Sequence, residues 1–76
     1  MTDSILRTAF ENVAGHLSNL EIVMNLIKEI ETEERSLESV IVFLEEKSKD
    51  AEVTLKTDIR ILINECLHLK SRMASE

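Results

Sequence analysis

Residues 29–36 read Glu-Ile-Glu-Thr-Glu-Glu-Arg-Ser, and this stretch decides whether the chain folds back on itself. Its glutamates are unfavourable at the negative end of a helix and favourable in the first turn of a following helix. The stretch therefore predicts a chain reversal, with Thr32 or Ser36 as the N-cap of the next helix. The alternative is one uninterrupted rod longer than about 100 Å, because the apolar spacing continues through the stretch and only Glu34 is out of character.

Upstream of this stretch, residues 5–27 carry apolar side chains at spacings of three and four, which is one stripe of a helix. Two features compete with a continuous helix. Gly15 is one, and the run Ser-Asn-Leu-Glu at 18–21 is the other, because it has the form of a capping box. The stripe keeps its phase across Gly15, which costs only about 1 kcal/mol relative to alanine inside a helix. We therefore expect a single helix over residues 4–31, with a break after Gly15 as the alternative.

Downstream, residues 37–73 carry a second apolar stripe that weakens in the middle. The run Lys-Ser-Lys-Asp at 47–50 puts basic residues where a helix can end and supplies caps for a following helix. A break near Ser48 predicts helices over 36–48 and 51–73, and hence a three-helix unit. Without that break the chain is a two-helix hairpin.

The composition indicates an all-α protein with a single domain over residues 1–76. The sequence has no proline and one glycine, and Leu, Ile, Glu and Lys dominate it, as in long helices. A chain this short hides only roughly 60% of the surface that its unfolded form exposes, so a monomer is marginal. Cys66 is the single cysteine and cannot form an internal disulfide. We therefore expect the helical unit to assemble into an oligomeric bundle or coiled coil.

Charge and hydropathy argue against several classes of partner. The net charge of −6 repels phosphate backbones and anionic lipid surfaces, so we expect no direct nucleic-acid ligand and no membrane. The longest apolar run, residues 40–44, is far shorter than the roughly 20 residues that cross a bilayer. Two aromatic residues leave little to line a pocket, so we expect no cofactor. The lone cysteine and the lack of a leader-like segment predict a cytoplasmic or nuclear protein.

Several apolar side chains lie off the two main stripes and form surplus apolar surface. They are Ile22, Leu26, Ile30, Val42, Phe43 and Ile61. Helices that are apolar on two sides are buried on two sides, and each large side chain buried contributes roughly 1.5 to 3 kcal/mol. We predict that this set is the interface of a homo-oligomer, a dimer or tetramer, or of a complex with a helical partner protein.

No combination of residues points to catalysis. Glu65 and His68 have the Glu-x-x-His spacing that di-iron bundles use twice, but they lie beside the predicted core face of their helix. Cys66 is best interpreted as a small core residue. We therefore predict a non-catalytic interaction or assembly subunit with no metal.

An acidic patch near the predicted reversal offers a second functional hypothesis. Its residues are Glu29, Glu31, Glu33 and Glu34. The simplest interpretation is a solvated helix end and turn. The functional alternative is a small acidic regulator that binds and blocks a basic enzyme or a DNA-binding protein.

Overall fold

Four α-helices and one 3-10 turn make up the part of the chain that the computed structural model describes, residues 3–33 and 36–74. In chain order they are α1 (Asp3–Val13), η1 (Ala14–His16), α2 (Leu20–Glu31), α3 (Leu37–Lys49) and α4 (Val53–Ala74). These described residues contain no strand, so the predicted all-α class is confirmed. None of the helices in them is long and apolar enough to cross a membrane.

The chain reversal predicted within residues 29–36 is confirmed, and Ser36 rather than Thr32 is the N-cap of α3. The Ser36 hydroxyl accepts a hydrogen bond from the backbone N–H of Ser39 at 3.2 Å. This bond satisfies one of the free donors at the start of a helix. The rod is wrong, because the molecule measures 36 × 24 × 19 Å. Glu34 lies outside the described residues.

The single helix predicted over residues 4–31 is wrong, and the alternative break after Gly15 occurs instead. α1 ends at Val13, and η1 adds one tighter turn. The backbone is then extended at Leu17, with φ −91° and ψ 135°, before α2 begins. The predicted capping box is not formed, because the N-cap is Asn19 and its side chain makes no capping hydrogen bond.

A contact with α4, far away in the sequence, stabilises this break. The carboxylate of Asp58 accepts hydrogen bonds from the backbone N–H groups of Ser18, at 3.0 Å, and Asn19, at 2.6 Å. It also accepts one from the Asn19 side-chain amide at 3.2 Å. Asp58 is only 1% exposed, and bonds to a buried ionised acceptor are strong. The site of Gly15 does not require glycine, since a Cβ atom there would meet nothing within 4 Å.

A second break separates α3 from α4, close to the boundaries predicted at 36–48 and 51–73. α3 ends at Lys49 and α4 begins at Val53. The two-helix hairpin is therefore wrong. The three-helix unit is incomplete, because the break after Gly15 divides its first helix into α1 and α2.

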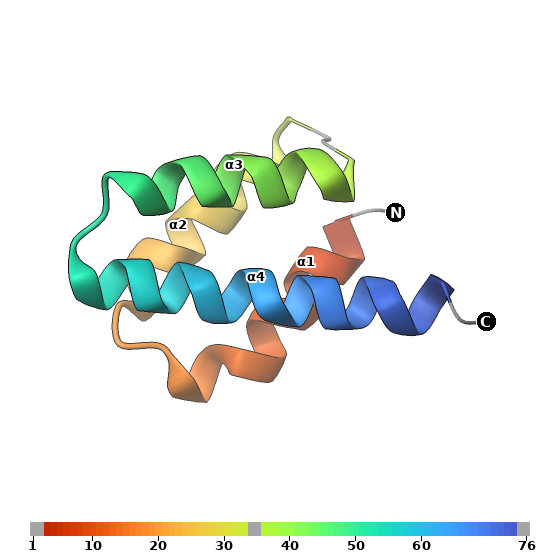
Figure 1. The fold of residues 1–76 in the computed structure, drawn as a ribbon, viewed down its shortest axis with the longest axis horizontal. Coiled ribbons are helices and arrows are strands. Elements are labelled where there is room, and N and C mark those ends of the chain that lie inside the picture. Colours follow the sequence, from red (N-terminus) through yellow and green to blue (C-terminus); the bar gives the residue numbers. More distant parts are fainter. Residues whose placement is uncertain (1–2, 34–35, 75–76) are drawn as a thin grey trace.

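α4 is the longest helix of the described residues, and α1 and α3 pack along it (Figure 1). It packs most extensively against α1 and α3, and Figure 1 shows α3 and α4 side by side and antiparallel. An ion pair between Lys70 Nζ and Glu38 Oε2, at 2.9 Å, joins the start of α3 to the last part of α4. This lysine lowers the pKa of the Glu38 carboxyl by hydrogen bonding to it, and a backbone hydrogen bond lowers it further.

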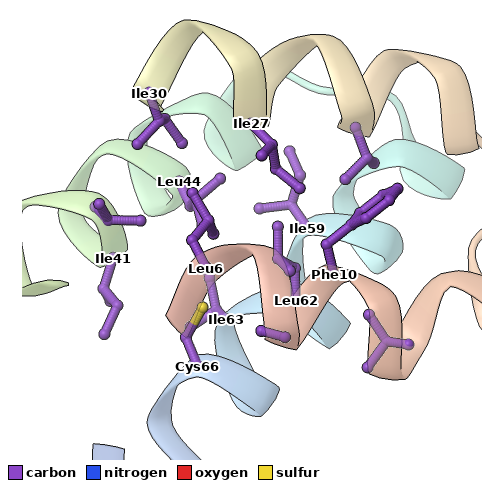
Figure 2. Packing of buried hydrophobic residues seen from close by; sticks show 14 residues of the cluster. Leu6, Phe10, Ile27, Ile30, Ile41, Leu44, Ile59, Leu62, Ile63 and Cys66 are labelled. Carbon is purple, nitrogen blue, oxygen red and sulfur yellow. The ribbon is translucent and has the colours of Figure 1, made fainter. Parts of the chain in front are cut away.

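One hydrophobic core receives side chains from all four helices (Figure 2). Its buried members are Leu6, Ala9, Phe10, Val13, Val23, Ile27, Ile30, Val40, Ile41, Leu44, Ile59, Leu62, Ile63 and Cys66. Cys66 is fully buried, which confirms its predicted place in the core. Burial raises the pKa of its thiol to about 11, and the neighbouring charge of Glu65 adds to this effect.

Candidate protein-interaction surface

A groove of about 560 Å³ runs between α3 and α4, and we call it the α3–α4 groove. Its lining from α3 is Val42, Glu45, Glu46, Ser48 and Lys49, and its lining from α4 is Lys56, Arg60, Ile63, Asn64 and Leu67. On each helix these positions recur at spacings of about three and four, so each set occupies one side of its helix. The groove is therefore formed by the two helix sides that flank the seam of an antiparallel pair.

Apolar side chains gather in the part of the groove farther from the α3–α4 turn. Val42 is 52% exposed and Leu67 is 45% exposed. Ile63 lies between them and the core, and is almost fully buried. Single exposed apolar residues are ordinary, but two in one groove with a third beneath them form a patch that a partner can cover.

Charged side chains of both signs line the part nearer the α3–α4 turn. Glu45 and Glu46 stand on the α3 wall, and Lys56 and Arg60 stand on the α4 wall. All four are exposed. No ion pair joins any of them to another residue in the described part of the chain. The groove thus presents fixed charges that are available to a partner.

Only two of the six predicted interface residues remain well exposed. Val42 lies in the groove, and Ile22 is 47% exposed on α2. Ile30 is 2% exposed and belongs to the core, so it is not available to a partner. Ile30 shares one face of α2 with Val23 and Ile27, at spacings of four and three, and this face packs into the core.

The other three predicted interface residues are partly covered within the molecule. Leu26, Phe43 and Ile61 pack against the hydrophobic core. The ammonium group of Lys47 also lies 5.3 Å from the centroid of the Phe43 ring, in the range of a cation–π contact. The surplus apolar surface is therefore smaller than the sequence predicts.

Three exposed apolar residues, Leu20, Val53 and Leu67, lie outside the predicted interface set. Leu67 is next to Cys66 and lies off the core line of α4, so a helical wheel contains the signal. Leu20 falls within the first stripe but is 44% exposed. It is the first residue of α2, and the stripe gives no sign of its exposure.

The acidic patch is partly neutralised by the molecule itself. Both oxygens of the Glu31 carboxylate accept hydrogen bonds from the Arg7 guanidinium, at 2.8 and 3.2 Å. This bidentate ion pair ties α1 to the end of α2. Glu29 and Glu33 are exposed, and Glu34 lies outside the described residues.

The residues with possible metal chemistry do not come together. Glu65 accepts a hydrogen bond from the side-chain amide of Asn12 at 3.0 Å, so it serves to link α4 to α1. His68 is exposed, whereas Cys66 is buried. Within residues 3–33 and 36–74, no three His, Cys, Asp or Glu side chains are placed to hold a metal ion.

Comparison with protein-family models, curated proteins and solved structures finds no match for this chain. Its own residues therefore carry the functional inference.

Proposed function

We propose that this protein is a non-catalytic helical interaction subunit that binds a partner protein through the α3–α4 groove. The observation that carries the proposal is the exposure of Val42 and Leu67 in one groove whose walls also present exposed charged side chains. Protein interfaces combine an apolar centre with a polar rim, and this groove has both parts in miniature. The apolar part supplies affinity on burial, and the charges select the partner and its orientation.

The scaffold suits this role because the groove is formed by two regular helices whose opposite sides pack into the hydrophobic core. Val40, Ile41 and Leu44 anchor α3 in the core, while Ile59, Leu62 and Cys66 anchor α4. A binding surface on packed helices keeps its shape when the partner arrives, so less ordering entropy opposes binding.

A site-specific photocrosslinking experiment tests the proposal. The chain is produced with a photoreactive amino acid in place of Leu67, and irradiated in native cell extract and as the purified protein. We expect a discrete covalent adduct with a partner. The Val42→Asp substitution in the same chain should suppress it, because a carboxylate in the apolar part of the groove opposes burial.

The matched control places the same photoreactive residue at Glu29, an exposed position in the acidic patch. No discrete adduct is expected from there. An adduct from position 29 with none from position 67 would overturn the proposal in favour of an acidic regulator. Adducts that Val42→Asp leaves unchanged would also overturn it.

A further inference from the structure

The two walls of the α3–α4 groove carry opposite charges near the turn. The α3 wall presents Glu45 and Glu46, and the α4 wall presents Lys56 and Arg60. A surface with this pattern is complementary to itself: when two copies meet face to face, the acidic α3 wall of each can lie against the basic α4 wall of the other. A two-fold pair of identical chains satisfies such a pattern twice, once on each side of the axis.

From this we infer that the occupant of the groove is a second copy of the same chain, with the two-fold axis running along the groove. α3 of each copy then lies over α4 of the other, and the four helices form an antiparallel bundle at the interface. The inference rests on the proposed function, since it names the partner of the same surface.

The direction of the axis follows from the difference between the two parts of the groove. A two-fold axis along the groove leaves every position unchanged in its distance along the groove. Each part of the groove therefore faces the same part of the second copy. Val42 then meets Leu67 of the other chain, and Glu45 and Glu46 meet the level of Arg60. A two-fold axis that runs across the groove, parallel to its floor, would instead place α3 over α3 of the other copy and the apolar part of one groove over the charged part of the other, which buries charges against apolar surface.

One residue is unfavourable in this arrangement and provides a sharp test. Lys49 lies on the otherwise acidic α3 wall, at the end nearest the turn. In the pair it approaches the level of Lys56 from the other copy, where like charges repel. Lys49→Glu should therefore tighten the pair, by roughly threefold or more in the dissociation constant.

The experiment is the mass of the protein in solution, measured by sedimentation or light scattering from about 1 µM to about 1 mM. The wild-type chain is expected to dimerise within this range. Two charge-reversal variants, Glu45→Lys with Glu46→Lys and Lys56→Glu with Arg60→Glu, should each weaken self-association by at least roughly tenfold, because like charges then face each other on both sides of the axis. All four positions are exposed, so circular dichroism should show unchanged helix content.

Mixing the two variants distinguishes self-complementarity from a general effect of charge. In the mixed pair, each reversed wall faces an oppositely charged wall, so dimers should reappear on mixing. The quadruple variant that carries all four reversals keeps the net charge of the wild type, and it should dimerise alone.

A wild-type chain that stays monomeric throughout the series would overturn the inference. A dimer that neither charge reversal weakens, or that mixing fails to restore, would also overturn this geometry. The proposed function fails separately: a monomeric chain that still gives a discrete adduct with a different protein from position 67 retains the interaction surface and loses only the second copy as its partner.

Discussion

The two ends of α2 are made by different physical means. At its C-terminal end, the turn to α3 is built from neighbours: the Thr32 hydroxyl donates to the backbone carbonyl of Glu29 at 2.7 Å, and Ser36 caps the next helix. At its N-terminal end, the separation from α1 depends on Asp58, whose partners are 39 and 40 residues away in the chain. The same helix thus starts at a tertiary contact and ends at a local signal. The two breaks should respond differently to substitution.

The largest expected effect is that of removing the remote contact. Asp58→Ala leaves the N–H groups of Ser18 and Asn19 without their acceptor and should lower the free energy of unfolding by about 3 kcal/mol, measured by urea denaturation. Asp58→Asn, which keeps the shape and one acceptor, should cost about half as much. Amide hydrogen exchange at positions 18 and 19 should accelerate in both variants. A loss below about 0.5 kcal/mol would mean that the break does not depend on Asp58.

The pH dependence of the free energy of unfolding tests how well α4, the helix that carries Asp58, is packed in the core. Burial raises the pKa of the Cys66 thiol from 9.0 to about 11, so the unfolded chain loses this proton before the folded chain does. Stability from this group is therefore complete below about pH 9 and declines as the pH rises from 9 towards 11, by about 1.4 kcal/mol at pH 10. Cys66→Ala should be less stable at neutral pH and lack this part of the alkaline decline. An identical decline in both proteins would contradict the assignment.

Breaking the local signal should have a smaller effect. Ser36→Ala removes the N-cap of α3 and should lower the free energy of unfolding by about 1 kcal/mol. Ser36→Asp is the matched control, because aspartate is an equally good N-cap and should retain the stability of the wild type. Equal destabilisation by both variants would show that the cap does not act through its hydrogen bond.

The smallest expected effect comes from a substitution within the break between α1 and α2, the break that Asp58 contacts from α4. Gly15→Ala should raise the free energy of unfolding by about 0.5 kcal/mol, because it restricts the unfolded chain and the new Cβ meets no atom within 4 Å. The break should persist, which NMR secondary shifts over residues 14–19 would show. A continuous helix through these residues would mean that glycine, and not Asp58, separates α1 from α2.

The same contrast explains what could be predicted from the sequence. The all-α class, the turn at Ser36 and the gap after Lys49 follow from signals that lie within a few residues of each feature. The break between α1 and α2 does not, because its acceptor is on another helix and the intervening stripe keeps a helical phase. Asp58 offers no sign of burial in the sequence, where it reads as one more acidic residue on a helix.

The interaction surface shows the same limit. Periodicity identifies Val42 as lying off its stripe, and Val42 is indeed exposed in the groove. It also selects Ile30, which is buried, because a helical wheel describes one helix and not the neighbours that cover it. The groove itself is a property of two helices together, and the register of α3 against α4 had to be seen before its two walls could be compared.

The dependence of the α1–α2 break on Asp58 has a consequence for how the protein is made. Residues 3–31 leave the ribosome well before Asp58 does, and at that stage they possess a helical stripe but no acceptor to interrupt it. We expect the nascent segment to favour a single helix through residues 14–19, and to bend into two only when α4 has been synthesised and packs against it. On this expectation, a helix that is translated later determines where an earlier helical segment divides.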